Sequence, residues 1–411
     1  MKTNVLTHIV PTLPPQSGSA GEYAFILASQ LRDQYGINSK FILCNPDWDG
    51  PTRIGEFVIR RLRLANEAGL WGMLASLKDH PSVLLHYDGC AYNKNGTPAW
   101  LYRGIKSWLD ESNHGVNRNK QQFITIFHKM WESSTKPWES AFYLQHLQQN
   151  LVKKLHSISQ SSVVTTPHSQ SFLETVAALK TWLLPVPGNL PIVERPQLNG
   201  GPETPLKVAI WGEPLFRADT LTKYSNLLHT LDKANRLACV TLIGRRFITS
   251  EAVEPDVAFL KKNISSKRIE TLRVSCLERV ALALSQSDLI LFPFGGRVAF
   301  KSGCFMSALA TGCAAVLCDG KDTFSLQEGK HFIACDDSAS GIQHFMQIIN
   351  SGELEQISTA GRTWYQRHAD WNVIARKYQE LLQGHLPAEA TREHLQNFPI
   401  WSQPTPVRHA D

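Results

Sequence analysis

Residues 288–312 read DLILFPFGGRVAFKSGCFMSALATG, and this stretch decides the fold. The apolar run at 288–293 predicts a buried strand, a Gly-Gly turn follows it, and a helix of small residues is predicted over 301–311. The next apolar run, 314–318, predicts another strand. A strand, a helix and a second strand in succession are typical of a βαβ unit, whose parallel strands lie in a sheet covered by helices.

The loop between that strand and its helix offers groups that suit a diphosphate. Gly295 and Gly296 allow the backbone to approach a ligand closely, and Lys301 supplies a positive charge. Ser302 and Gly303 open the helix, where unpaired N–H groups favour an anion. The loop lacks the G-x-x-x-x-G-K-[ST] spacing of a Walker A motif. The alternative is an ordinary helix capped by Ser302, with Lys301 in solvent.

The same alternation of strands and helices extends through both halves of the chain. In the second half it predicts strands at 206–211, 239–243 and 269–274, with helices near 219–232, 252–262 and 277–286. In the first half it predicts strands at 5–11, 37–44, 82–87, 122–128 and 162–166, with helices near 20–34, 66–78, 97–110 and 138–157. A helical pattern also covers 356–382. Two α/β units with doubly covered parallel sheets are therefore expected.

A segment rich in Pro and Gly, 185–205, separates the two units and has the composition of a linker. We expect an N-terminal Rossmann-like domain over 1–190 and a C-terminal Rossmann-like domain over 203–370. The remaining tail, 386–411, contains several prolines and shows no periodicity. It is expected to be extended or disordered.

Ligands of open parallel sheets bind beyond the carboxyl ends of the strands, so the residues that follow each strand are candidates for a site. Gly18 and Ser19 follow the first strand and open a helix, which suits phosphate or sugar hydroxyls. The alternative is a plain turn with Ser19 as the helix cap. His86 and His128 end two further strands of the same predicted sheet. A core or loop role is the alternative for either histidine alone, and the two together favour a site.

Strand ends of the second half offer further candidates. Gly212 follows the strand at 206–211, and the basic residues Arg217 and Lys223 come shortly after it. Arg245 follows the strand at 239–243 directly. An ordinary exposed charge is the alternative for each, and the position of Arg245 at a strand end makes it the strongest of the three.

Bulk properties narrow the class of protein. The chain has 411 residues, 43% hydrophobic residues and a net charge of +6, which is weak evidence for nucleic acid over this length. No apolar run reaches the roughly 18–20 residues of a membrane helix, and the cytoplasm is the expected compartment. None of the eight cysteines forms a C-x-x-C pair, so buried free thiols are expected and a zinc site is not.

The elements above, in this order, resemble retaining glycosyltransferases of the family-4 type with the GT-B fold, over residues 5–385. The Ser17–Gly21 loop resembles the first loop of that family, and Ser287–Leu317 resembles its donor motif. Ala360–Arg362 followed by Trp371 and Ile374 resembles its terminal helices. The resemblance implies two Rossmann-like domains facing a central cleft, with a helix at 371–385 that crosses back to the first domain.

The resemblance also implies an activity and roles for the residues. A sugar would pass from a nucleotide-diphosphate donor of UDP or GDP type to a hydroxyl of a glycan, a lipid or a small molecule, with retention and without a metal or other cofactor. His128 would contact the donor sugar, and Lys301 and Arg245 would stabilise the departing diphosphate. The acceptor is expected near Gly18, Ser19, His86 and Tyr87.

The sequence departs from the family at two positions. Its donor motif usually carries two glutamates, and Ala299 and Ser307 stand in their places. The first normally contacts the donor sugar and the second the ribose, so donor identity is open. One alternative is a catalytically degenerate GT-B protein that acts as a binding or partner subunit. A second alternative is a nucleotide-sugar 2-epimerase, which would need carboxylates that this chain scarcely offers.

The segment Arg53–Leu64 mixes arginines with large apolar residues. One interpretation is a peripheral contact with anionic lipid at the inner face of a membrane, where an acceptor would lie. The favoured interpretation is a buried strand at Phe57–Ile59 with arginines solvated at its ends. The sequence leaves the oligomeric state open.

Overall fold

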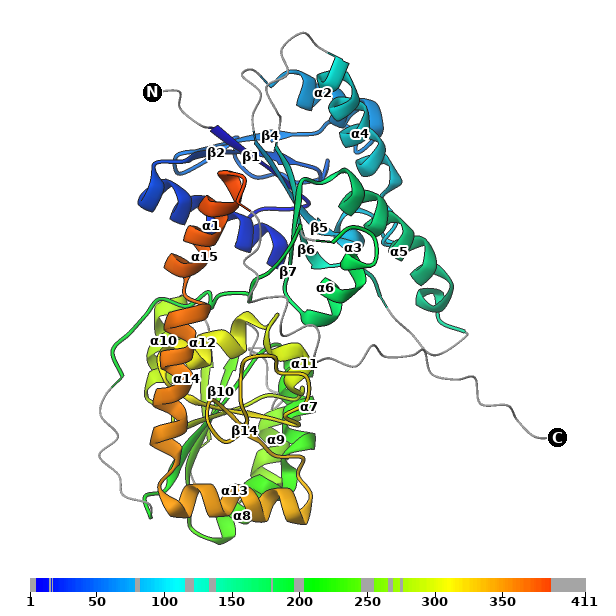
Figure 1. Cartoon of the computed structure of the whole chain (residues 1–411). Helices are drawn as coiled ribbons and strands as arrows, with labels where there is room; N and C mark the ends of the chain where they lie inside the picture. Colours follow the sequence, from blue (N-terminus) through cyan, green and yellow to red (C-terminus); the bar gives the residue numbers. More distant parts are fainter. Residues whose placement is uncertain are drawn as a thin grey trace, which may run out of the picture. The chain divides into compact units, whose positions relative to one another are not determined.

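The structure is a computed structural model of the whole chain. It describes residues 5–14, 16, 18–77, 82–114, 122–132, 138–178, 180–195, 203–244, 255–264, 269–273 and 276–385. Arg245, part of the predicted linker (196–202) and the tail 386–411 lie outside the described residues. The chain divides into two compact units (Figure 1): unit 1 holds Met1–Leu183 and Tyr378–Asp411, and unit 2 holds Leu184–Lys377.

Unit 1 is built on an eight-stranded sheet in its described part, with the order β3-β4-β2-β1-β5-β6-β7-β8. Every neighbouring pair is parallel except β3 and β4. The strands are β1 Val5–Val10, β2 Asn38–Leu43, β3 Arg53–Ile54, β4 Phe57–Arg61, β5 Val83–Asp88, β6 Phe123–Lys129, β7 Ser161–Val164 and β8 Thr181–Leu183. All five strands predicted for the first half are confirmed, and β3 and β8 are additions too short to show a pattern.

The segment rich in arginine forms β4, which confirms the strand interpretation. Phe57 and Ile59 point into the core, while Val58 between them is 43% exposed. The Arg60 guanidinium donates to Ser76 Oγ over 3.4 Å, and that of Arg61 donates to the Trp48 carbonyl. The alternation follows from the two-residue period of a strand. The lipid contact stays a prediction.

Helices cover both faces of this sheet. They are α1 Ser19–Tyr35, α2 Glu67–Ala75, α3 Gly89–Tyr92, α4 Ala99–His114, α5 Ser140–Ile158 and α6 Pro167–Glu174. One core cluster joins α2, α4 and α5 to β5, β6 and β7, and a smaller one joins α1 to β2 and β4. The end of α15 (Trp371–Leu382) lies beside α1, where the Tyr23 hydroxyl donates to that of Tyr378 over 3.1 Å (Figure 1).

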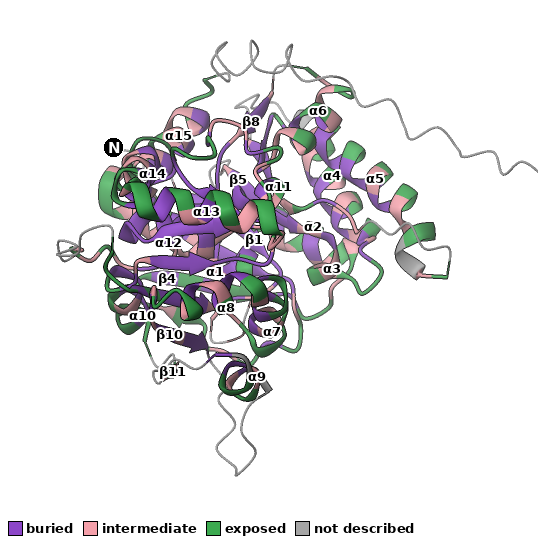
Figure 2. Cartoon of the chain, turned by 90° about the horizontal axis from the view of Figure 1, so that it is seen from below, coloured by how far each residue is buried: buried purple, intermediate pink, exposed green. Residues whose placement is uncertain are grey.

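Unit 2 contains a six-stranded, wholly parallel sheet in its described part, with the order β11-β10-β9-β12-β13-β14. Its strands are β9 Leu206–Trp211, β10 Leu237–Gly244, β11 Ile269–Arg273, β12 Leu289–Leu291, β13 Ala314–Leu317 and β14 Ile333–Ala334. Figure 2 shows strands coloured as buried and helices such as α13 with an exposed outer face. A parallel sheet needs this cover because its strands are apolar on both sides.

The helices of unit 2 are α7 Pro214–Lys223, α8 Ser225–Lys233, α9 Pro255–Asn263, α10 Leu277–Ser285, α11 Gly296–Ala299, α12 Gly303–Thr311, α13 Ala339–Ser351, α14 Leu354–His368 and the first part of α15. The single helix predicted over 219–232 is wrong, because Tyr224 interrupts it. The Tyr224 side chain is fully buried, and its hydroxyl donates to the Phe292 carbonyl over 2.9 Å. The pattern at 356–382 likewise divides, at Asp370, whose carboxylate accepts from Asn372 N at the start of α15.

Among the described residues, no helix is both long enough and apolar enough to cross a membrane.

One buried ion pair is expected to matter for the stability of unit 2. The Arg217 Nε of α7 lies 2.5 Å from Asp256 Oδ2 of α9, and both side chains are almost wholly buried. Replacing Asp256 by Ala leaves a buried guanidinium without its counter-charge, so unfolding should become easier by about 3–5 kcal/mol. Hydrogen exchange of the β9 and β10 amides measures this loss. The exposed pair Arg297–Asp322 of the same unit is the control, and Arg297→Ala should cost less than about 1 kcal/mol. Equal effects would contradict the structural role of the buried pair.

Candidate functional site

The carboxyl end of β12 carries two helix starts in close succession. The short α11 begins at Gly296, and α12 begins at Gly303 after a turn that contains Lys301. Ser302 is the N-cap of α12, and its hydroxyl accepts from Phe305 N over 3.2 Å. Lys301 is exposed beside this start. The capping interpretation of Ser302 is thus confirmed, while the helix start still presents its amides next to a lysine.

The Gly-Gly turn is packed against an aspartate. The Gly296 N–H lies 3.1 Å from the Asp319 carbonyl and 3.3 Å from its carboxylate, which also accepts from Lys321 N at 3.0 Å. A Cβ on Gly295 would collide with that carboxylate, and one on Gly296 would collide with the Lys321 carbonyl. Close approach to the segment after β13 therefore requires glycine at both positions. The loop predicted to hold a diphosphate therefore offers less room than expected, because the Asp319 carboxylate lies against Gly295 and Gly296.

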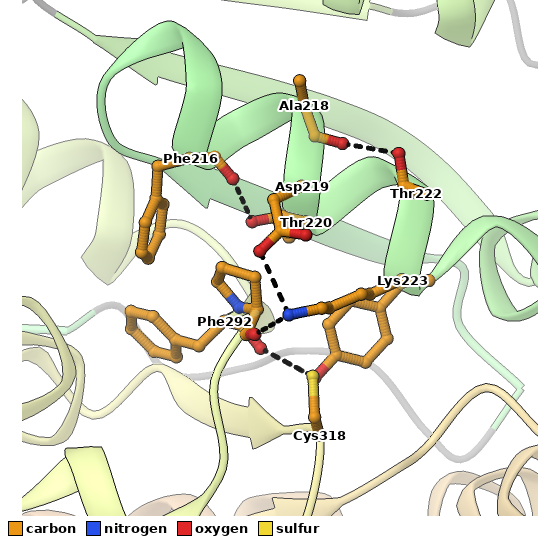
Figure 3. A network of polar contacts seen from close by, with 10 residues as sticks. Phe216, Ala218, Asp219, Thr220, Thr222, Lys223, Phe292 and Cys318 are labelled. Carbon is orange, nitrogen blue, oxygen red and sulfur yellow. Dashed lines mark hydrogen bonds and ion pairs between the residues drawn. The ribbon is translucent and has the colours of Figure 1, made fainter. Parts of the chain in front are cut away.

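Lys223 holds the end of β12 just before this turn, through a hydrogen bond to the Pro293 carbonyl. Figure 3 shows it extending from α7, with Nζ donating to the Pro293 carbonyl over 2.6 Å and pairing with Asp219 over 3.1 Å. The Cys318 thiol and the Tyr224 hydroxyl both approach the Phe292 carbonyl. The end of β12 is thus held by side chains of α7 and β13. Lys223 was an ordinary basic candidate in the sequence, and the structure gives it a defined place at this strand end.

Gly212 lies at the end of β9 and adopts a φ of +156°, which favours glycine. Its carbonyl accepts from Arg217 Nη1 at 3.0 Å. A Cβ on Gly244, at the end of β10, would meet the same guanidinium. Arg217 is therefore not an exposed charge, because it ties the ends of β9 and β10 together from inside.

The positions of the two family glutamates are inside the core. Ala299 and Ser307 both have no exposed surface. The Ser307 hydroxyl faces Asn189 Oδ1 at 3.4 Å, and a Cβ on Gly188 would meet it at 2.8 Å. The segment after Leu184 therefore covers Ser307, and its role as a ribose ligand stays a prediction.

In unit 1, the first loop contacts Thr12. A Cβ on Gly18 would collide with the Thr12 hydroxyl, and one on Gly21 with the Thr12 carbonyl. Ser19, the first residue of α1, is exposed. The turn interpretation holds for the backbone, except that Gly18 takes the cap position in place of Ser19. A binding role for Gly18 and Ser19 stays a prediction.

Three histidines form a hydrogen-bonded row across the sheet of unit 1. His8 Nδ1 lies 3.0 Å from His86 Nε2, and His86 Nδ1 lies 3.1 Å from His128 Nε2. At the inner end, His8 Nε2 lies 3.2 Å from Ser39 Oγ. His8 and His86 are fully buried, and His128 is half-buried. We call Ser39, His8, His86 and His128 the histidine row.

Burial keeps the histidine row neutral. Desolvation lowers the pKa of His8 to about 3 and that of His128 to about 4. The pKa of His86 is lowered well below its usual value, first by burial and then by the two neighbouring histidines. Neutral imidazole is both a donor and an acceptor, so each ring can satisfy its neighbour without a buried charge. Among the described residues, no three His, Cys, Asp or Glu side chains group as metal ligands.

The predicted site residues therefore fall into separate groups. In unit 2 the structure brings Gly295, Gly296, Lys301, Ser302 and Gly303 together, and it buries Ser307. In unit 1 it joins His86 to His128. His86 and Tyr87 are fully buried, so neither reaches a surface where an acceptor would lie. Sequence reasoning missed His8, Ser39 and Asp319. A histidine inside the first apolar strand was the one available signal for the row.

No family model matches the sequence, and no curated protein matches it. Solved structures do match. Sucrose-phosphate synthase (tll1590) from Thermosynechococcus elongatus is 14% identical at a TM-score of 0.62, with 93% of this chain and 98% of that chain covered. HepE (Alr3699) from Anabaena, solved with UDP-glucose, is 11% identical at a TM-score of 0.55, with 93% and 100% covered. The pneumococcal O-GlcNAc transferase GtfA, solved with UDP and GlcNAc, is 10% identical at 0.58, with 93% and 99% covered.

Identities this low establish the fold and nothing beyond it. The chain has the GT-B architecture of glycosyltransferases, with two Rossmann-like units, as the resemblance in sequence implied.

The histidine row predicts that unit 1 is sensitive to acid. In the unfolded chain a histidine has a pKa of roughly 6.5, far above the folded value of His8. The unfolded state therefore binds more protons below that pH, and stability falls as the pH drops. His8→Gln removes one such group, so the slope of unfolding free energy between pH 6 and 4.5 should decrease by about 1.4 kcal/mol per pH unit. Hydrogen exchange of the β1 and β5 amides at several pH values measures this slope. His146→Gln, at an exposed position, should leave the slope as it is, and an unchanged slope in His8→Gln would contradict the prediction.

Proposed function

We propose that this protein is a glycosyltransferase that moves a sugar from a nucleoside-diphosphate donor to an acceptor hydroxyl with retention of configuration. The observation that carries the proposal is the start of α12 beside Lys301, at the carboxyl end of β12 in a chain with the GT-B fold. Open parallel sheets bind their ligands at such strand ends. The amides of a helix start and an adjacent lysine suit a diphosphate.

The proposed transfer needs groups that stabilise negative charge on the leaving diphosphate. When the bond between the sugar and the diphosphate breaks, negative charge grows on the leaving phosphate. Lys301 and the N–H groups at the start of α12 are preorganised to stabilise that charge as it forms. Arg245, which follows β10 in the sequence and lies outside the described residues, is proposed to assist. No protein nucleophile and no metal is needed for these contacts.

The donor is proposed to be a uridine nucleotide sugar. Two of the matching structures were solved with UDP-glucose or with UDP and GlcNAc, which is the ground for this choice. His128 is proposed to contact the sugar, because it is the half-buried end of an otherwise buried row. The proposed acceptor is a hydroxyl of a glycan, a lipid or a small molecule.

The proposal is tested first on the purified chain with a panel of UDP- and GDP-sugars, by following release of nucleoside diphosphate. Turnover of at least one sugar is expected. Binding without turnover across the panel would favour a catalytically degenerate partner subunit, in line with Ala299 and Ser307 in place of the glutamates.

Lys301→Ala should weaken the binding of UDP. A charge-assisted contact contributes roughly 1.5–3 kcal/mol, so the Kd should rise about ten- to a hundred-fold. Calorimetry with UDP measures the change. Lys233→Ala removes an exposed lysine at the end of α8 and should leave the Kd unchanged. An unaltered Kd in Lys301→Ala would remove this residue from the site.

His128→Ala should weaken the contact with the donor sugar and leave the contacts with the nucleotide intact. Loss of one hydrogen bond to the sugar should lower the turnover of UDP-glucose about ten-fold or more, with the Kd for UDP almost intact. His146→Ala, at an exposed position of α5, is the control for histidine loss. A parallel loss of UDP binding in His128→Ala would indicate a structural histidine.

A further inference from the structure

The histidine row is diagonal and lies on one face of the sheet. Ser39 pairs in register with Leu6, and His8 lies two residues further along β1. His8 pairs with Leu84, and His86 lies two residues further along β5. His86 pairs with Ile126, and His128 again lies two residues further. Each step therefore crosses one strand and advances two residues, which keeps Ser39, His8 and His86 on the same face. His128 lies at a register shift between β5 and β6, and its hydrogen bond to His86 continues the row.

The row is enclosed along its length. Phe41 stacks on His8 with ring centroids 5.0 Å apart, and the Tyr23 ring meets His128 edge-on at 5.0 Å. Successive imidazoles lie nearly parallel, with centroids 5.3 Å apart in both pairs. Such packing leaves each ring little freedom to rotate, so the hydrogen-bond pairing is fixed by geometry.

A row of neutral imidazoles has only two fully bonded arrangements. Each ring carries one hydrogen, so all hydrogens lie either on Nδ1 or on Nε2. In the first arrangement Ser39 donates to His8 Nε2, His8 Nδ1–H donates to His86, and His86 Nδ1–H donates to His128 Nε2. The open Nδ1 of His128 then carries a hydrogen. In the second arrangement every bond is reversed, and the open Nδ1 of His128 is an acceptor.

Exposure at the two ends distinguishes these arrangements. The first leaves one open donor, His128 Nδ1–H, at the half-buried end of the row. The second leaves the open donor on the Ser39 hydroxyl, in a residue that is only 7% exposed. Donors without a partner are rarely buried, and the end with more access to water can satisfy one. The first arrangement is therefore favoured.

We propose that His86, His8 and Ser39 are positioning residues that fix His128 in its Nδ1–H tautomer and thereby make it a hydrogen-bond donor to the sugar of the nucleotide ligand. The tautomer rests on the geometry of the row alone. The contact with a sugar rests also on the proposed function.

The first test needs no ligand. Ring nitrogens of histidine labelled with ¹⁵N report which nitrogen carries the hydrogen, and His128→Gln assigns the signal. Nδ1–H tautomers are expected for His8, His86 and His128 together at neutral pH. An Nε2–H tautomer at His128, or unlike tautomers within the row, would overturn the proposal.

The second test compares two replacements of similar shape at His86. The Asn side-chain nitrogen takes about the place of ring Nδ1 and donates to His128, while Leu fills the space without a donor. The measured quantity is the ratio of Kd values for UDP and UDP-glucose. His86→Leu should lower the preference for UDP-glucose about ten-fold, and His86→Asn should restore most of it.

The matched control is a buried histidine outside the row. His156 Nδ1 lies 2.8 Å from Ser162 Oγ, and both residues are buried in unit 1. His156→Leu should lower stability as His86→Leu does and leave the ratio of Kd values unchanged. Equal ratios in His86→Leu and His86→Asn would overturn the positioning role. If wild-type protein binds UDP and UDP-glucose equally, the contact with the sugar fails, while the tautomers still decide the arrangement of the row.

Discussion

Hydrogen bonding inside a doubly covered parallel sheet is the constraint on which the rest of unit 1 depends. The faces of β1, β5 and β6 are closed by helices, so a polar side chain there is stabilised when it finds a partner within the protein. His8, His86 and Ser39 find such partners in one another, and their neutrality follows from burial. His128 lies near the carboxyl end of β6 and is the half-buried member of the row.

Unit 2 meets the same constraint at its strand ends. Arg217 is fully buried, yet its charge is balanced by Asp256 and its Nη1 donates to the Gly212 carbonyl. Lys223 binds the Pro293 carbonyl at the end of β12. These interactions hold the ends of β9, β10 and β12 in place. A site that relies on preorganised N–H groups needs such support, because a mobile loop would lose the benefit on binding.

The fold could be predicted from the sequence because it depends on patterns that are local. The apolar run 206–211 coincides with the observed strand, and the helix predicted over 301–311 is observed as α12, Gly303–Thr311. The short α11 at Gly296–Ala299 was not predicted. The break at Tyr224 could not be predicted, since it depends on a bond to Phe292 that is remote in sequence. The same holds for the site. His128 was found from its place at a strand end, whereas Asp319 and Ser39 matter only through contacts that folding creates.

The carboxylate of Asp319 has a consequence for any anion that approaches the turn at Gly296. That amide already donates within the protein, to the Asp319 carbonyl at 3.1 Å and to the Asp319 carboxylate at 3.3 Å. Both acceptors are tethered by the chain and so present at high effective concentration. A phosphate that took this amide would have to displace a group of like charge, and the two would then repel each other at short range. The Asp319 carboxylate therefore competes with any anion for the Gly296 amide. An anion at the start of α11 would therefore meet this carboxylate.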